Sequence, residues 1–253
     1  MESAPKLIAE GITYRFGDTL ALQGASLQVR PGEFVSIVGP SGCGKSTLFN
    51  VISGLLAPTS GRVTIDGRDV TGSTGHVGYM FQDDLLVPWR TVVRNIVLGA
   101  ALTRGASGKD EAEARALGER YGLRGFLDHY PHALSGGMRQ RVALMRTLAV
   151  HRDVLLLDEP FGALDSQTRL EMQRWLLDVW DELDRTVLFV THDVDEAIFL
   201  ADRVLVMSPR PGRIATEIAV PIPRPRGLET LTSSGFMDVK RRILSFLYGQ
   251  GAA

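Results

Sequence analysis

The segment of this chain that most constrains its fold is residues 39–47, GPSGCGKST, which fit the pattern G-x-x-x-x-G-K-[ST]. Glycines let the backbone approach a phosphate group closely, and the loop N–H groups point inward at the anion. Lys45 supplies a positive charge for the β- and γ-phosphates, and the Ser46 hydroxyl offers Mg2+ the hard oxygen ligand it prefers. An apolar run at 34–38 precedes the loop, and a helix-competent stretch at 46–53 follows it. This order of strand, loop and helix predicts a phosphate-binding P-loop.

We expect the whole loop to bind nucleotide, namely Gly39, Pro40, Ser41, Gly42, Cys43, Gly44, Lys45, Ser46 and Thr47. Cys43 is the only cysteine, which excludes an internal disulfide framework and is typical of a reducing compartment. We interpret it as a small loop residue rather than as a nucleophile.

Short runs that are apolar on both faces alternate with helical stretches, which indicates an α/β fold with a mostly parallel core sheet. The predicted core strands are residues 34–38, 77–80, 154–157, 186–190 and 204–207. Alternating patterns near the N-terminus predict a small antiparallel sheet from residues 7–9, 26–29 and 62–65. The expected domains are an ATP-binding core of residues 1–82 and 151–208, an inserted helical signature subdomain of residues 83–150, and a C-terminal part of residues 209–253.

Two helices are predicted from the spacing of apolar residues. The first follows Asp165, its expected N-cap, and its apolar stripe consists of Met172, Trp175, Leu176, Val179, Trp180 and Leu183. The C-terminal part opens with a proline-rich segment, which predicts a linker or an edge segment. It ends in an amphipathic helix whose apolar residues are Phe236, Val239, Ile243, Leu244 and Leu247.

Two adjacent carboxylates, Asp158 and Glu159, directly follow the strand at 154–157. The strand ends of such a sheet open into the ligand crevice, so we expect both side chains near the P-loop. We predict that Asp158 holds Mg2+, directly or through water, and that Glu159 polarises a water for in-line attack on the γ-phosphate. Two acids after a strand are by themselves usually a cap or a solvated turn, and it is the upstream P-loop that favours the chemical role.

His192 follows the strand at 186–190 and precedes a helix-start pattern with Glu196 as its reciprocal capping acid. A lone histidine is usually structural. This one is expected at the same sheet edge as the P-loop and Glu159, where a γ-phosphate would lie. We therefore place His192 with Glu159 and Lys45 among the catalytic candidates.

Residues 134–141, LSGGMRQR, begin a long helical run. Ser135 and the two glycines after it are either an N-cap with a flexible approach to the helix or a second anion site at a helix N-terminus. One chain with one P-loop has no need of two such sites on the same phosphate. A dimer in which each chain completes the other's site would account for both.

Charge and hydropathy exclude several classes of function. Lys and Arg number 28 against 29 Asp and Glu, and this balance argues against a protein that wraps nucleic acid. The longest apolar stretches fall far short of about 18–20 residues, so we expect no membrane span. The N-terminus shows no apolar signal-peptide core. These features favour a cytosol-facing ATPase or other enzyme.

The motifs of this chain and their order resemble those of the ATP-binding subunit of an ABC transporter. In chain order they are the P-loop, Gln82, LSGGMRQR, LLLDEP, GALD and His192. The resemblance extends from residue 8 to residue 207 and implies an ABC-type P-loop ATPase that uses ATP and Mg2+. It implies that Phe16 stacks on adenine, with Tyr14 as the weaker candidate. It also implies that Gln82 contacts Mg2+ and the attacking water, and that it relays the nucleotide state to the helical subdomain.

The same resemblance assigns roles across a dimer interface. Ser135, Gly136 and Gly137 would bind the γ-phosphate held by the partner subunit. Asp165 would cross the interface in addition to capping its helix. The family usually has serine where this chain has Gly162, which is a mild departure.

Flanking segments resemble importers of the nitrate, sulfonate and taurine group: QDDLLVPWRTVVRNI, HALSGGMRQRVAL and MSPRPGRI. This resemblance implies a small anion or sulfonate-like solute, a homodimer of ATP-binding subunits, and permease subunits at the cytoplasmic face of the inner membrane. A periplasmic or extracellular solute-binding protein would be an indirect partner, and no nucleic acid is expected. The permease contact is expected near Leu85 and Trp89. The alternative interpretation is that these apolar residues belong to the core of the helical subdomain.

Three alternatives stay open on the sequence. An exporter or lipoprotein-release ATPase is disfavoured only by the flanking resemblance. A soluble ABC ATPase acting on nucleic acid would typically show long coiled coils, zinc-binding cysteines or tandem cassettes. A P-loop kinase or GTPase of another class would not account for LSGGMRQR and His192.

Overall fold

The computed structural model describes residues 4–162, 164–183 and 185–249, and its centre is a six-stranded sheet. The strand order is β10-β9-β3-β8-β7-β6, and β10 alone runs antiparallel to its neighbour. The strands are β3 (Phe34–Val38), β6 (Gly78–Met80), β7 (Val154–Asp158), β8 (Thr186–Val190), β9 (Arg203–Met207) and β10 (Ile214–Ala219). All five predicted core strands are present, which confirms the α/β fold class with a mostly parallel core.

The edge strand β10 lies within the C-terminal part of the chain. It is free of proline and occupies the stretch between Pro211 and Pro221, so the segment predicted as a linker or edge adds a strand to the core sheet. The core sheet therefore extends beyond residue 208, the predicted end of the ATP-binding core.

Every residue of β3, β7 and β8 is buried because the sheet is covered on both faces. Phe34, Leu155 and Phe189 pack with the helices on one face. Their neighbours Val35 and Leu156 point to the other face, where they pack with α1 and the second sheet. The alternation of side chains along each strand thus feeds two hydrophobic cores.

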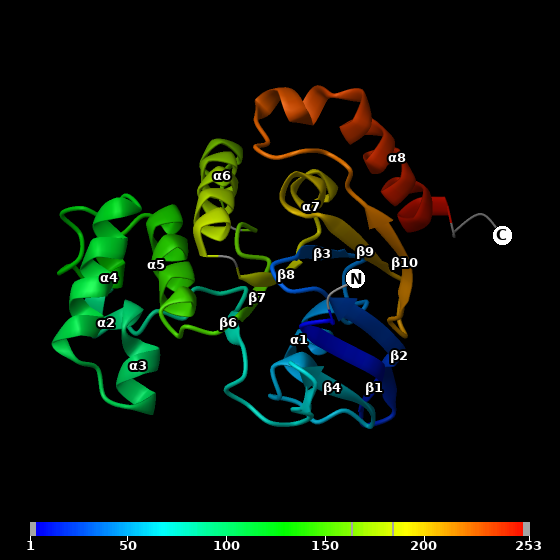
Figure 1. Cartoon of the computed structure of the whole chain (residues 1–253), viewed down its shortest axis with the longest axis horizontal. Helices are drawn as coiled ribbons and strands as arrows, with labels where there is room; N and C mark the ends of the chain where they lie inside the picture. Colours follow the sequence, from blue (N-terminus) through cyan, green and yellow to red (C-terminus); the bar gives the residue numbers. More distant parts are fainter. Residues whose placement is uncertain (1–3, 163, 184, 250–253) are drawn as a thin grey trace.

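The second sheet is antiparallel, with the strand order β2-β1-β4-β5. It is formed by β1 (Leu7–Phe16), β2 (Thr19–Val29), β4 (Ser60–Ile65) and β5 (Arg68–Asp69). The predicted antiparallel sheet is present, and β1 and β2 extend well past the predicted segments. Figure 1 shows this sheet beneath the core sheet, with α1 (Lys45–Ile52) between them.

Four α-helices lie together at one side of the molecule (Figure 1). They are α2 (Val92–Ile96), α3 (Leu98–Thr103), α4 (Gly108–Arg120) and α5 (Gly136–Leu148), with the short 3-10 helix η1 (Pro131–Ala133) before α5. The remaining helices are α6 (Ser166–Leu183), α7 (Val194–Leu200), η2 (Leu228–Thr232) and α8 (Ser234–Gly249).

Both predicted amphipathic helices are present. Asp165 caps α6, since its Oδ1 accepts hydrogen bonds from the Gln167 and Thr168 N–H groups, both at 3.1 Å. Met172, Leu176 and Val179 are buried, and Trp175 and Trp180 pack against the same core; the side chain of Leu183 lies outside the described part of the chain. In α8, the buried residues are Phe236, Val239 and Ile243.

Candidate nucleotide-binding and hydrolysis site

The loop of residues 39–47 connects the carboxyl end of β3 to α1. Gly44 has φ +109 just ahead of the helix, and a Cβ there would lie 2.8 Å from the side chain of Leu22, so only glycine fits. The Lys45 side chain folds back over the loop, where its Nζ donates to Gly39 O at 2.9 Å and Pro40 O at 3.2 Å. A buried ammonium is thus held among the loop carbonyls, at the place where the anion of a P-loop lies.

An open pocket of about 510 Å3 lies over this loop. It is lined by Phe16, Thr19, Ala21, Ser41, Gly42, Gly44, Lys45, Ser46, Thr47, Gln82, Glu159 and Arg210. Phe16 is 53% exposed, and its ring packs edge-on against Tyr14 at a centroid distance of 4.8 Å. An exposed aromatic face therefore borders the phosphate loop.

Three of the predicted loop residues lie behind the pocket rather than in its wall. Gly39 and Pro40 present their carbonyls to Lys45, and Cys43 is buried next to Gly39. Burial raises the pKa of the Cys43 thiol, which favours its protonated form.

Asp158 ends β7 with a buried side chain whose Oδ1 has no hydrogen-bond partner among the described residues. Its Oδ2 accepts from the Tyr79 hydroxyl at 3.4 Å. Burial raises the pKa of Asp158, and the nearby Ser46 side chain opposes that shift.

An unsatisfied carboxylate oxygen beside a serine hydroxyl is a fitting place for Mg2+, which prefers hard oxygen ligands. Ser46 and Asp158 would hold the ion, with Gln82 in the same pocket as a further oxygen donor. When bound, the ion supplies positive charge against the phosphate oxygens.

Glu159 directly follows β7, and its backbone has φ +46, a left-handed conformation that is unusual for a glutamate. Its N–H donates to Val190 O at 2.9 Å, which fixes the turn against the end of β8. Glu159 Oε2 lies 3.2 Å from Nδ1 of His192, whose side chain is 57% exposed. A carboxylate and an imidazole thus meet at the rim of the P-loop pocket.

The helix after His192 begins differently from the predicted pattern. Asp193 Oδ1 accepts from the Asp195 and Glu196 N–H groups, so the N-cap itself is present. The Glu196 carboxylate is buried against α6, where its Oε1 accepts from Gln173 Nε2 at 3.0 Å. Its role as reciprocal cap is therefore replaced by a contact between two helices.

The Ser135, Gly136 and Gly137 segment lies outside the chain's own P-loop pocket. Ser135 Oγ accepts from the Met138 N–H at 3.3 Å, so the predicted N-cap is present, and Ser135 and Gly136 are exposed. A Cβ at Gly137 would lie 2.8 Å from Thr168, which explains a glycine where this segment approaches α6.

The segment that follows Gln82 is bound to α5, the helix that Ser135 caps. Arg139 Nε donates to Asp84 Oδ2 at 3.0 Å. Arg146 donates to the Asp84 carbonyl at 2.6 Å and to the Leu85 carbonyl at 2.8 Å. A pocket residue is thereby connected, within two residues, to the helix of the LSGGMRQR segment.

Residues 85–89 divide between core and surface. Leu86 is buried in the core of the helical region, which agrees with the core interpretation for this residue. Leu85 is 56% exposed and Trp89 is 77% exposed, so neither is a core residue.

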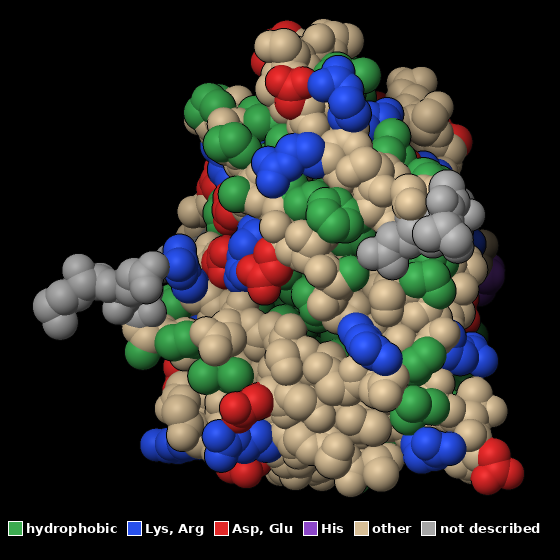
Figure 2. Space-filling view, turned by 90° about the vertical axis from the view of Figure 1, so that its right-hand side faces the viewer, with side chains coloured by type: hydrophobic (Ala, Val, Ile, Leu, Met, Phe, Trp, Pro, Cys, Tyr) green, Lys and Arg blue, Asp and Glu red, His purple; other side chains and the backbone are tan. Residues whose placement is uncertain are grey.

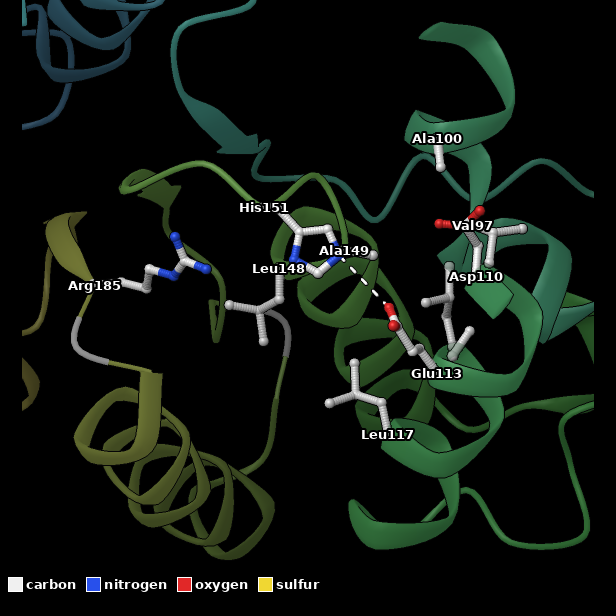
Figure 3. Close-up of a pocket in the computed structure, with 11 residues that line it drawn as sticks. Val97, Ala100, Asp110, Glu113, Leu117, Leu148, Ala149, His151 and Arg185 are labelled. Atoms are coloured by element: carbon white, nitrogen blue, oxygen red, sulfur yellow. Dashed lines mark ion pairs between the residues drawn. The ribbon is translucent and has the colours of Figure 1, made fainter. Parts of the chain in front are cut away.

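A second, smaller pocket of about 130 Å3 lies between α4 and the end of α5 (Figure 3). Its walls are mostly apolar, and His151 Nε2 lies 3.8 Å from Glu113 Oε2 across it. No residue of the P-loop lines this pocket.

Tyr79 and Arg210 lie at the main site but are not among the residues predicted for it from the sequence. Tyr79 was placed only within a core strand, and its contact with Asp158 depends on the pairing of β6 with β7. Arg210 lies in MSPRPGRI, a segment used above only for its resemblance to importers.

Three features together define a P-loop ATPase. They are the strand–loop–helix unit with Lys45, the paired carboxylates at the end of β7, and the histidine after β8. Comparison with known proteins agrees: residues 22–162 match the family model described as ABC transporter. The chain belongs to this family, as an ATP-binding cassette ATPase that uses ATP and Mg2+.

Similar proteins include two named for import. The chain is 45% identical over 233 residues to the nitrate import ATP-binding protein NrtD of Synechocystis, covering 92% of this chain and 86% of that protein. It is 43% identical over 214 residues to the taurine import ATP-binding protein TauB of Yersinia pestis, covering 85% and 84%. These matches agree with the resemblance to the nitrate, sulfonate and taurine group.

Two solved structures share the fold. The cassette MJ0796, a dimer bound to ADP and Pi in a post-hydrolysis state, has a TM-score of 0.73 at 34% identity, covering 88% of this chain and all of that one. CbiO1 from Clostridium perfringens, part of the transporter complex cbiONQ, has a TM-score of 0.78 at 27% identity, covering 98% and 97%. Within the described residues of our chain, no helix is long and apolar enough to cross a membrane.

Proposed function

We propose that this chain is the ATP-hydrolysing subunit of an importer for a small anion or sulfonate-like solute. Two copies would dock on integral membrane permease subunits at the cytoplasmic face of the cell membrane and would receive solute indirectly from a solute-binding protein. The observation that carries the proposal is the joint presence, in one pocket, of the P-loop, Gln82 and Glu159, in a chain similar to nitrate and taurine import proteins.

In the proposed reaction Phe16 stacks on adenine, and Lys45 pairs with the β- and γ-phosphates. Glu159 accepts a proton from a water molecule while the oxygen of that water attacks the γ-phosphorus. The bond from the γ-phosphorus to the ADP oxygen then breaks. His192 orients the Glu159 carboxylate through the 3.2 Å contact. Gln82 positions the water from within the same pocket.

The Ser135 to Gly137 segment is proposed to act on the nucleotide of the second copy. Ser135 and Gly136 are exposed, and the segment lies outside its own pocket. It begins α5, a 13-residue helix whose first N–H groups have no acceptor within the helix. Two copies related by a two-fold axis would each complete the other's site.

The helical region, residues 83–150, is proposed as the part that faces the permease. Leu85 and Trp89 are exposed apolar side chains in the segment that connects Gln82 with this region. An exposed tryptophan beside a proline is well suited to anchor a partner helix. The contacts of Asp84 and Leu85 with α5 would carry the nucleotide state to that surface.

The test is purification of the tagged chain from detergent-solubilised membranes of the cell that encodes it. The proposal expects integral membrane subunits to co-purify, and the complex in lipid nanodiscs to hydrolyse ATP faster with a loaded solute-binding protein. Nitrate, taurine and alkanesulfonates are the solutes to screen. Isolation of the chain without membrane subunits, or with nucleic acid or ribosomes, would contradict it.

A further inference from the structure

The loop between β9 and β10, residues 208–213, is packed directly against the P-loop. A Cβ at Gly212 would collide with the carbonyl of Cys43, so the two backbones are in contact. The Gly212 N–H donates to Ala21 O at 2.9 Å, and the Gln23 N–H donates to Gly212 O at 3.1 Å. These bonds fix the loop to β2, the strand that supplies Ala21 to the nucleotide pocket.

The loop is also closed on itself. The Ser208 N–H donates to Arg213 O at 2.9 Å, and the Arg213 N–H donates to Ser208 Oγ at 3.1 Å. Ser208 Oγ in turn donates to Pro209 O at 3.0 Å and Pro211 O at 3.3 Å. Residue 210 is therefore carried by a well-defined turn, and its side chain enters the pocket from a fixed base.

Arg210 is the second cation in the wall of the pocket, after Lys45. Its Nε and Nη2 lie 3.3 and 3.2 Å from Gly42 O. A guanidinium has five N–H donors, and the Gly42 carbonyl is its only hydrogen-bond partner among the described residues. An exposed cation with donors to spare thus stands at the edge of a phosphate-binding loop.

We propose that Arg210 binds the phosphate chain of the nucleotide, at the end nearer the base. Its loop is attached to β2 beside Ala21, close to the hairpin that carries Phe16. Glu159 and His192 come instead from the ends of β7 and β8. Arg210 therefore contributes to the binding of ATP and ADP alike, whereas the groups at the γ-phosphate distinguish the two.

The competing interpretation is that Arg210 only braces the P-loop through the Gly42 carbonyl. The two roles differ in their requirement for charge. A brace needs a donor, which glutamine also provides, while a phosphate contact needs a cation, which lysine preserves. A phosphate contact also weakens as salt is added, because the ions screen it.

The experiment is calorimetric titration of the full chain with ATP and with ADP, at low and at high salt. We expect Arg210→Ala and Arg210→Gln each to weaken both nucleotides about tenfold or more at low salt, and Arg210→Lys to lose only a few-fold. The loss should shrink at high salt. The matched control is Arg213→Ala. Arg213 belongs to the same loop, but its side chain donates to Gln23 and does not line the pocket.

Unchanged affinity in Arg210→Ala would overturn the proposal, and so would full rescue by glutamine, which would assign Arg210 to the brace. A loss that does not depend on salt would also overturn it. The inference rests on ATP binding by the parent chain. A parent that fails to bind ATP refutes the proposed function itself, whereas a parent and an Arg210→Ala variant that bind equally refute only the role of Arg210.

Discussion

His192 Nδ1 lies 3.2 Å from Glu159 Oε2, and these two residues come from the ends of the neighbouring strands β7 and β8. The backbone supports the contact, because the Glu159 N–H donates to the last carbonyl of β8, that of Val190. The left-handed turn at Glu159 then directs its side chain into the pocket that Lys45 shares. Strand pairing thus brings the proposed base, Glu159, next to His192.

We predict that Glu159→Gln retains ATP binding and loses most hydrolysis. The amide keeps the shape of the side chain but cannot accept a proton, and general-base contributions are on the order of 10²–10⁴-fold. Phosphate release under saturating MgATP measures the effect, with Glu171→Gln on the exposed side of α6 as control. Turnover within a few-fold of the parent would require a different base.

Lys45→Ala should instead weaken the binding of ATP itself. The ammonium lies among the loop carbonyls of Gly39 and Pro40, where the phosphates are expected, and its removal leaves that site without its closest cation. A loss of about tenfold or more is expected by calorimetry. Parent-like affinity in a folded variant would show that the loop is not the phosphate site.

The buried Arg226 should be important for stability. Its Nη1 donates to the carbonyls of Ile198, Phe199 and Ala201, which end α7, and burial lowers its pKa to about 10. Arg226→Lys keeps the charge but cannot reproduce this geometry, so we expect a loss of about 2–4 kcal/mol in the free energy of unfolding.

The measurement is the urea midpoint of unfolding. The control is Arg241→Lys, because Arg241 is exposed and forms an ion pair with Asp238 at the surface. Arg241 should show no more than about 0.5 kcal/mol of change. Equal midpoints for the two variants would mean that the cap of α7 contributes little.

Trp89→Ala should leave the isolated chain folded and able to bind ATP, yet weaken its assembly with permease subunits. The side chain is 77% exposed, so its removal opens no cavity, while a lost anchor costs about 2 kcal/mol or more, roughly a thirtyfold drop in affinity. Leu102→Ala, which removes another strongly exposed apolar side chain of the helical region, is the control. A large fall in melting temperature, or an unchanged yield of complex, would count against the anchor.

Much of the fold was predictable because its determinants are local. The strand β3 matches the predicted residues exactly at 34–38, since a run that is apolar on both faces can only be covered on both sides. The antiparallel strands are longer than predicted. β1 continues through Phe16, past register shifts that interrupt the alternation of its side chains. The P-loop and the carboxylates of β7 were predictable because each motif sits at a strand end.

What the sequence did not reveal depends on contacts between distant segments. Arg210 enters the site because the β9–β10 loop packs on a loop about 170 residues earlier, and no local pattern encodes that contact. Tyr79 reaches Asp158 through strand pairing, and no local pattern distinguishes the exposed Trp89 from the buried Leu86. Figure 2 shows acidic and basic side chains intermingled on the face near α8 and β10.

In the proposed dimer, each nucleotide is enclosed between the P-loop of one copy and Ser135 to Gly137 of another. The most direct measurement is the mass of Glu159→Gln protein by light scattering, with and without MgATP. We predict a shift from monomer to dimer on addition of MgATP. Adding Ser135→Arg should abolish that shift while ATP binding is preserved. The same mass in both conditions, or a dimer that tolerates arginine at position 135, would contradict it.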